Sequence, residues 1–532
     1  MFLTSVRTSL VDAVRHPAVR RGMLGSLCLT IGSFAPGYLP SSSTPRRWLL
    51  SVGIDGTFYR GIGMFFVAAG LLLLSFAWLA LRPSNKVRLP VKKVAAAGDI
   101  TTVRDGLVAS SETLDNESGG TADLPAANVA QWAVLVLWSL PLLLAAPIFS
   151  ADAYSYAAQG WLWHNDINPY GVGPGTLPGA YADNVAWVWR WTKAPYGPFA
   201  IEINYWLVLL CRFHPALTAW MMRLPALVGV ALLAYCLPRM AKRNDRDPHV
   251  VFWFGVLNPM VLINFVGGCH NDSLMIGLMV AGLWLAGCRG RFANYNWLLA
   301  AAVVGLAAAV KQPAVLAAVA VPFLAQPIKR WTPRFLVIYG ARVLVSVGIA
   351  VGVFALISWS TGLGFGWVFA VNVPGSIITL APFTMLGELL AWLAASFDAP
   401  QLAATAVFWS RTFGLFLAAV AGIVLAWRRL PRNPHAFVSY GLLWFVFCSP
   451  ALHPWYLLWG GSLLPLATRE RGLRICIWAT LTVLGFHAVI ASWYNAMLPL
   501  GIASCVGLLI AVLHGYEAQL PNGLLTSWRA TR

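Results

Sequence analysis

Charged side chains are scarce in this chain of 532 residues: Asp, Glu, Lys and Arg together make up 11% of it, while hydrophobic residues make up 59%. The mean hydropathy is +0.69. A soluble domain with so few charges is difficult to keep in solution, so this composition excludes an ordinary soluble protein. Repeated apolar runs of about 15–25 residues predict instead an all-α, polytopic integral membrane protein.

Acidic residues are especially few, with 19 Asp and Glu against 37 Lys and Arg, for a net charge of +18. An excess of positive charge is also typical of nucleic-acid-binding proteins. Here, however, the basic residues cluster in short loops between apolar runs, as the positive-inside rule requires. We therefore expect no nucleic-acid partner.

The eight cysteines are scattered, and no Cys-x-x-Cys spacing occurs. They are interpreted as small buried hydrophobic residues, and neither a metal nor a cofactor is expected from them. No cleavable signal peptide is recognised. Arg20 and Arg21 precede the first apolar run, which predicts an uncleaved first helix with its N-terminus inside.

The apolar runs predict about fourteen transmembrane helices with both ends of the chain in the cytoplasm, because the basic loops between them all fall on one side. The predicted spans are 22–40, 60–82, 128–149, 217–240, 250–266, 273–288, 296–310, 313–327, 335–358, 403–427, 435–449, 455–468, 473–491 and 497–514. The predicted divisions are a cytoplasmic N-terminus (1–21), two first helices (22–82), a disordered cytoplasmic linker (83–127), a transmembrane catalytic core (128–515) and a cytoplasmic tail (516–532).

Two long loops are predicted on the opposite, outer side, at 150–216 and 359–402. The first ends in the apolar segment 196–211, which is too short to span easily and is flanked by Pro198 and Pro215. If this segment crossed the membrane, the following basic loop would fall on the wrong side. We therefore expect an interfacial helix lying in the membrane plane.

Asp152 stands directly after an apolar run that ends near residue 149. An ionised carboxylate drawn toward hydrocarbon costs on the order of 2.5–3.5 kcal/mol. Tyrosines, a glutamine and tryptophans follow Asp152, rather than lysines that would neutralise it. This pattern predicts an acid held at the membrane face for chemistry on a lipid-borne substrate.

Other polar residues are expected to converge on the same outer face from separate helices, which fits a site at the membrane–water boundary. They are Arg223, His270, Asn271, Asp272, Lys311, Gln312, Arg411 and His453. The acids, histidines and cations also have a purely structural interpretation: Asp152 and Asp272 as helix caps, the histidines as satisfied buried groups, and the cations as interfacial anchors.

This set of residues suits transfer of a sugar from a lipid phosphate. The leaving phosphate needs positive charge rather than a general acid, and the attacking hydroxyl needs one base, for which a carboxylate is suitable. Hydrolysis of a glycoside would instead call for two carboxylates flanking the bond.

An acid at the start of the first outer loop, an interfacial helix and a following arginine resemble the polyprenyl-phosphate-sugar-dependent GT-C glycosyltransferases. Within them, the chain resembles the actinobacterial α-1,6-mannosyltransferases that build the backbone of lipomannan and lipoarabinomannan. The motifs that carry this resemblance are Asp152-Ala-Tyr-Ser-Tyr156 with Gln159-Gly160, Asn168-Pro-Tyr170, His270-Asn-Asp272, Lys311-Gln-Pro313 and His453-Pro-Trp-Tyr456.

The resemblance implies a GT-C fold in the plasma membrane, with the active site facing the periplasmic, cell-wall side. The implied donor is polyprenyl-phosphate-mannose and the implied acceptor a mannan or a phosphatidylinositol-mannoside-type glycolipid, with inversion at the anomeric carbon and no metal. Asp152 is the implied general base. Implied substrate-binding residues are Tyr154, Tyr156, Gln159, His270, Asn271, Asp272, Lys311, Gln312, His453, Trp455 and Tyr456, and the donor phosphate is assigned to Arg223, Lys311 and Arg411.

Three alternatives stay open at this point. A related transferase with another sugar, arabinofuranosyl or α-1,2-mannosyl, shares these features. A non-catalytic flippase or transporter of lipid-linked sugars is a further possibility, although transporters place charges near midspan and show inverted repeats. A metal held between Asp152 and Asp272 is the third.

Overall fold

The computed structural model describes residues 2–34, 39–40, 43–54, 56–83, 129–289, 295–328, 330–370, 379–494 and 498–517. All regular structure within these ranges is helical, which confirms the all-α prediction. The predicted linker 83–127 and tail 516–532 lie almost entirely outside the described residues.

Five helical segments among the described residues are long and apolar enough to cross a membrane, and a sixth is bent by 42° at a break. This finding confirms a polytopic membrane protein. The remaining apolar helices are shorter, so the count of fourteen spans is not confirmed. The five are α4 (Thr57–Ala80), α9 with α10 (Pro215–Met221 and Arg223–Arg243), α16 (Pro333–Ser360), α19 (Pro400–Arg429) and α23 (Glu470–Tyr494); the bent one joins α11 (Pro248–Gly255) to α12 and η2 (Pro259–Val261 and Leu262–Gly267).

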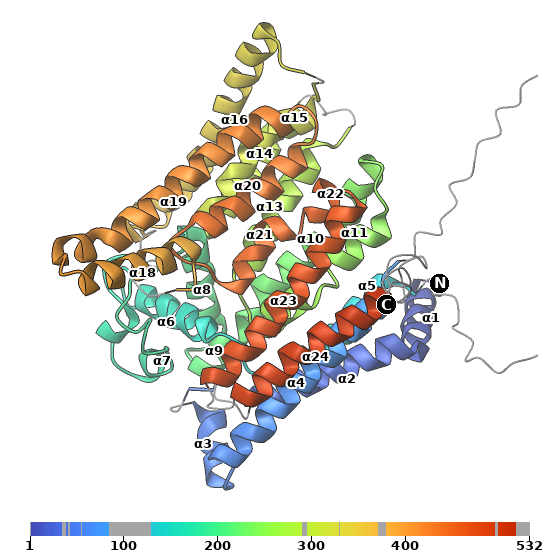
Figure 1. Ribbon diagram of the computed structural model, residues 1–532, viewed down its shortest axis with the longest axis vertical. Coiled ribbons are helices and arrows are strands. Elements are labelled where there is room, and N and C mark those ends of the chain that lie inside the picture. The colour runs from blue at the N-terminus through green and yellow to red at the C-terminus, as the bar shows by residue number, and fades with distance from the viewer. Residues whose placement is uncertain are drawn as a thin grey trace, which may run out of the picture.

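The shorter helices complete the bundle (Figure 1). Near the N-terminus are α1 (Phe2–Arg15), α2 (Pro17–Phe34), α3 (Thr44–Ser51) and α5 (Gln131–Leu142). Further along the chain are α13 (Asp272–Ala286), α14 (Asn296–Val310), η3 (Gln312–Val315), α15 (Leu316–Ala325), α20 (Pro434–Cys448) and α24 (Leu498–Glu517).

The segment predicted as a span at 455–468 is three short pieces instead of one helix: η5 (Pro454–Leu457), α21 (Leu458–Gly461) and α22 (Leu464–Ala467). Two consecutive glycines and Pro465 disfavour a continuous helix there. Irregular backbone at membrane depth is tolerated where protein surrounds it, and this segment buries Trp459, Leu463 and Leu466.

The predicted loop 150–216 folds into α6 (Asp152–His164), η1 (Pro174–Thr176), α7 (Ala180–Asp183) and α8 (Pro198–Leu210). The predicted loop 359–402 contains α17 (Trp367–Ala370) and α18 (Pro382–Ser396). Helices α6, α7, α8 and α18 lie at one end of the molecule, and α1 and the last described turn of α24 lie toward the other end (Figure 1). The expectation that α8 lies in the membrane plane stays a prediction.

The N-terminal helices are fixed to the core by a pair of tryptophans. Trp78 of α4 and Trp253 of α11 are fully buried and stack with ring centroids 4.5 Å apart. Each indole Nε1 donates to the other residue's carbonyl, at 3.0 Å from Trp78 and 2.7 Å from Trp253. Satisfying both polar atoms is what makes such rings stable in an apolar interior.

Helices α10 and α13 cross with almost no side chain between them. A Cβ at Gly277 would lie 2.6 Å from the Cα of Gly229, and one at Gly229 would lie 2.1 Å from the carbonyl oxygen of Ser273. Small residues permit this close approach of helices within a bilayer. The contact sets the position of the first turn of α13, which begins with Asp272.

We expect Gly277→Ala to lower the melting temperature in detergent by several degrees, because overpacking of this kind typically costs about 1–3 kcal/mol. The matched control is Gly340→Ala in α16, where a Cβ would meet no atom within 4 Å. Equal melting temperatures for the two variants would contradict the close-packing account.

Candidate active site

Asp152 is the first residue of α6, and its carboxylate is positioned by the local backbone. The hydroxyl of Ser150 accepts a hydrogen bond from the Asp152 N–H at 3.1 Å. Phe149, just before, has a φ of 61°, which turns the chain sharply out of the preceding segment. A carboxylate in the first turn also interacts favourably with the helix dipole.

Two side chains contact the Asp152 carboxylate. His270 Nδ1 lies 3.5 Å from Oδ2, and the Tyr156 hydroxyl donates to the same oxygen at 3.4 Å. Burial by itself raises the pKa of Asp152. The adjacent His270, and after it the charges of His453 and Lys311, outweigh burial and hold the pKa below its ordinary value. Asp152 is therefore a carboxylate at neutral pH, as a general base must be.

His270 and His453 both stack on the indole of Trp455. The ring centroids lie 3.8 Å apart for His270 and 4.7 Å for His453. His270 is fully buried and follows Cys269, whose φ of 59° is rare for a residue with a side chain. Burial lowers the pKa of His453 to about 4, so this imidazole is neutral at pH 7.

Asp272 and Lys311 form a buried ion pair. Lys311 Nζ donates to Asp272 Oδ1 at 2.8 Å, and the Trp459 indole donates to the same oxygen at 2.5 Å. Lys311 occupies the break between α14 and η3, with its ammonium 4.2 Å from the centroid of the Tyr456 ring. The lysine charge is thus compensated by one carboxylate and by an aromatic face.

Several buried polar atoms of this cluster have no hydrogen-bond partner among the described residues. They are Gln159 Oε1, both ring nitrogens of His270, both amide atoms of Asn271, and Asp272 Oδ2. A native protein rarely leaves buried polar atoms unpaired, so these atoms indicate where a polar ligand would bind. All four residues were predicted to bind substrate.

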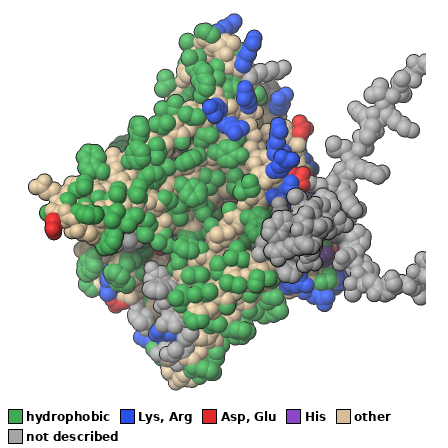
Figure 2. Space-filling model, in the orientation of Figure 1, with side chains coloured by type: hydrophobic (Ala, Val, Ile, Leu, Met, Phe, Trp, Pro, Cys, Tyr) green, Lys and Arg blue, Asp and Glu red, His purple; other side chains and the backbone are tan. Residues whose placement is uncertain are grey.

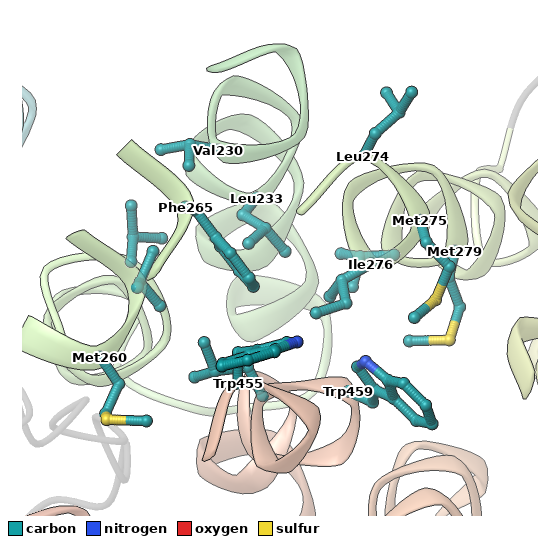
Figure 3. Packing of buried hydrophobic residues seen from close by; sticks show 14 of the residues in the cluster. Val230, Leu233, Met260, Phe265, Leu274, Met275, Ile276, Met279, Trp455 and Trp459 are labelled. Atoms are coloured by element: carbon teal, nitrogen blue, oxygen red, sulfur yellow. The ribbon is translucent and has the colours of Figure 1, made fainter. Parts of the chain in front are cut away.

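The aromatic residues of the predicted His-Pro-Trp-Tyr motif line the same cluster. Tyr456 and Trp459 stack with centroids 4.4 Å apart. Figure 3 shows Trp455 and Trp459 lying against apolar side chains of α10, η2 and α13, including Phe265 and Ile276. This apolar layer holds the two indoles in place.

Arg223, predicted to bind donor phosphate, directs its donors to main-chain carbonyls instead. Its guanidinium donates to Val266 at 3.2 Å, to Gly267 at 3.2 Å, to Trp220 at 3.4 Å and to Ala145. It therefore connects the segment that precedes Asp152 to the turn that precedes His270.

Two other predicted residues border the cluster. Arg411 Nε of α19 donates to the Thr384 hydroxyl at 2.9 Å, and that hydroxyl donates to the Pro450 carbonyl at 2.7 Å, in the loop that carries His453. Gln312 Nε2 donates to the Pro195 carbonyl at 3.4 Å.

Tyr154 lies on α6 two residues from Asp152 and is buried.

The sequence left open a metal ion held between Asp152 and Asp272. In the part of the chain that the structure describes, no three His, Cys, Asp or Glu side chains are grouped closely enough to hold an ion. Independence from metal stays a prediction.

Sequence reasoning assigned no role to three residues of this site. The centroid of the Tyr196 ring lies 5.1 Å from that of Tyr156 and 5.5 Å from Lys311 Nζ. The Trp459 indole donates to the Asp272 carboxylate. His487 of α23 is buried beside Phe149, at 5.1 Å between ring centroids. A histidine within an apolar span was a signal that could have identified His487.

We expect Asp272→Asn to destabilise the protein by about 3–5 kcal/mol, because the Lys311 ammonium would remain buried without a counter-charge. Adding Lys311→Met to this variant removes that charge and should restore most of the lost thermal stability. The measurement is the melting temperature of each variant in the same detergent. A double variant no more stable than Asp272→Asn would contradict the ion-pair account.

Comparison with known proteins identifies the family. Residues 19–327 match the family described as alpha-(1->6)-mannopyranosyltransferase, N-terminal domain. Alpha-(1->6)-mannopyranosyltransferase A of Mycobacterium tuberculosis is 33% identical over 362 residues, which cover 64% of this chain and 66% of that relative. The chain thus spans just under two thirds of that protein.

Two further relatives align over most of this chain. A Mycolicibacterium smegmatis protein named probable alpha-(1->6)-mannopyranosyltransferase is 30% identical over 502 residues, covering 87% of this chain and 82% of the relative. Alpha-(1->6)-mannopyranosyltransferase B of Corynebacterium glutamicum is 25% identical over 527 residues, covering 96% and 81%. The family match extends over the segments that contain Asp152, His270, Asp272 and Lys311, and the chain belongs to the alpha-(1->6)-mannopyranosyltransferase family.

Proposed function

We propose that this protein transfers mannose from polyprenyl-phosphate-mannose to the 6-hydroxyl of an α-1,6-mannan acceptor, with inversion at the anomeric carbon. The observation that carries the proposal is the Asp152 carboxylate, held ionised at the start of α6 beside His270 and within an aromatic cluster. Family membership supports mannose as the sugar.

In the proposed reaction Asp152 accepts the proton of the acceptor hydroxyl. The hydroxyl oxygen forms a bond to the anomeric carbon on the face opposite the phosphate. The bond between that carbon and the phosphate oxygen breaks, and its electron pair leaves with polyprenyl phosphate. Asp152 then returns its proton to solvent. A β-linked donor gives an α-linked product, and a single base suffices for this step.

Positive charge for the departing phosphate is proposed to come from Lys311, which is close enough to Asp152 for its charge to lower the pKa of that carboxyl group. Arg411 is a second candidate, because it adjoins the loop that carries His453. Arg223 is proposed to act by positioning, since its donors engage backbone carbonyls. The mechanism invokes side-chain charge rather than a metal ion.

The acceptor sugar is proposed to bind on the other side of Asp152, through residues with unpaired polar atoms and through the aromatic rings beside them. Gln159 and Asn271 would hydrogen-bond sugar hydroxyls, and Tyr156 and Trp455 would contact the ring. A mannan or a phosphatidylinositol-mannoside-type glycolipid offers such hydroxyls.

The proposed location is the plasma membrane, with the active site on the periplasmic side. Lys and Arg gather along the edge of the molecule that lies far from α6 (Figure 2), and the positive-inside rule assigns that edge to the cytoplasm. The end with α6 and α18 would then face outward. A lipid-linked donor and a glycolipid acceptor both reach this face through the bilayer.

Asp152→Asn is expected to lower turnover by about 10²–10⁴-fold, the typical contribution of a positioned base. The assay uses purified protein, synthetic polyprenyl-phospho-mannose and a short α-1,6-mannoside, and GDP-mannose alone should not support product. The control is Asp166→Asn, an exposed carboxylate just beyond the end of the same helix. Folded wild-type protein that extends no mannosyl acceptor would favour another sugar donor or a flippase.

The pH profile separates a carboxylate base at Asp152 from a histidine base. Activity is lost when the base is protonated, and the lowered pKa of Asp152 moves that loss to acidic pH. We therefore expect kcat/KM to stay level from pH 7 down to about pH 5. A histidine base would instead make kcat/KM decline near pH 6.5, since the ordinary pKa of histidine is about 6.5. Such a decline would overturn the assignment.

A further inference from the structure

A second charged site lies at the end of the molecule opposite α6. It is a cavity of about 620 Å³ between the segment before α16 and the segment joining α19 to α20. Its lining consists of four arginines, two tryptophans and a proline: Arg330, Trp331, Trp427, Arg428, Arg429, Pro431 and Arg432.

The cavity has a built frame. Trp331 and Trp427 stack with centroids 5.6 Å apart and planes at 15°, and Trp331 Nε1 donates to the Trp427 carbonyl at 2.8 Å. The Thr332 hydroxyl caps the start of α16 by accepting from the Phe335 N–H. Arg428 and Arg429 form the last turn of α19. These contacts hold the two chain segments together around the cavity.

The four guanidinium groups repel one another, since like charges close together raise the energy of the protein alone. None of the ion pairs between described residues involves them. Arg429 lies over the Tyr440 ring, at 5.7 Å from its centroid. An anion in the cavity would relieve this repulsion. A phosphate suits the cavity because one guanidinium can donate two parallel hydrogen bonds to phosphate oxygens.

The helices beside the cavity present apolar surface to the bilayer. In the apolar stretch of each helix that could cross the membrane, only 22% of the residues of α16 and 11% of those of α19 are buried inside the protein. Val337, Leu344 and Ile423 are 74%, 75% and 72% exposed. These side chains lie within a few helical turns of the arginines, so an anion at the cavity would sit directly above hydrocarbon-facing surface.

We propose that this cavity binds an anionic phospholipid, with the headgroup phosphate among the arginines and the acyl chains along α16 and α19. Basic pockets between helix ends on the cytoplasmic side of a membrane bind such headgroups. A free polyphosphate would match the arginines equally well, but it would leave the adjoining apolar surface unused.

The test is retention of lipid by the full chain in detergent, measured by native mass spectrometry with phosphatidylglycerol or phosphatidylcholine. The variant is Arg330→Gln with Arg428→Gln and Arg432→Gln. The control is Arg7→Gln with Arg20→Gln and Arg21→Gln, three exposed arginines near the N-terminus. Single Arg432→Gln serves if the triple variant does not fold, because it leaves the tryptophan contacts intact.

Wild type and control should retain phosphatidylglycerol in preference to phosphatidylcholine and melt several degrees higher with it. The triple variant should bind about a hundredfold more weakly, since each arginine near an anionic headgroup is worth roughly fivefold in affinity. Equal retention by variant and wild type, or equal loss in the control, would overturn the proposal. The proposal would also be overturned if inorganic pyrophosphate raised the melting temperature of the wild type while the wild type retained no lipid.

Discussion

The candidate site depends on one buried ion pair, between Asp272 and Lys311, which a third group, the Trp459 indole, completes. Neither charge is stable alone in this interior, so the start of α13, the end of α14 and α21 must meet at one place. Asp152 and His270 lie beside this junction. The geometry around the proposed base therefore follows from an ion pair that need not take part in proton transfer.

Arg223 stabilises the backbone that leads into the same junction. By donating to carbonyls of the segment before Asp152 and of the last two residues of η2, it holds together the two stretches of backbone that lead to Asp152 and His270. Both stretches include a residue with positive φ, Phe149 and Cys269. Strained backbone of this kind persists where surrounding contacts fix it, and here it directs the acid and the imidazole toward each other.

The two ends of the molecule differ in chemistry. At one end, carboxylates, histidines and aromatic rings form a buried cluster with unpaired polar atoms. At the other, arginines gather around a cavity beside lipid-facing helices. The first end suits a reaction on a lipid-linked sugar, and the second suits attachment to anionic lipid. Spatial separation lets either property change without disturbing the other.

The sequence by itself determined the all-helical membrane fold, because apolar length and the placement of basic loops are local properties. It also identified Asp152, His270, Asp272 and Lys311 as candidates. Tertiary structure alone decided their partners, since the pairing of Asp272 with Lys311 joins residues 39 positions apart and that with Trp459 joins residues 187 apart. Tertiary structure likewise divided the predicted span 455–468 into short pieces, because neighbouring helices bury this segment and irregular backbone is tolerated where protein surrounds it.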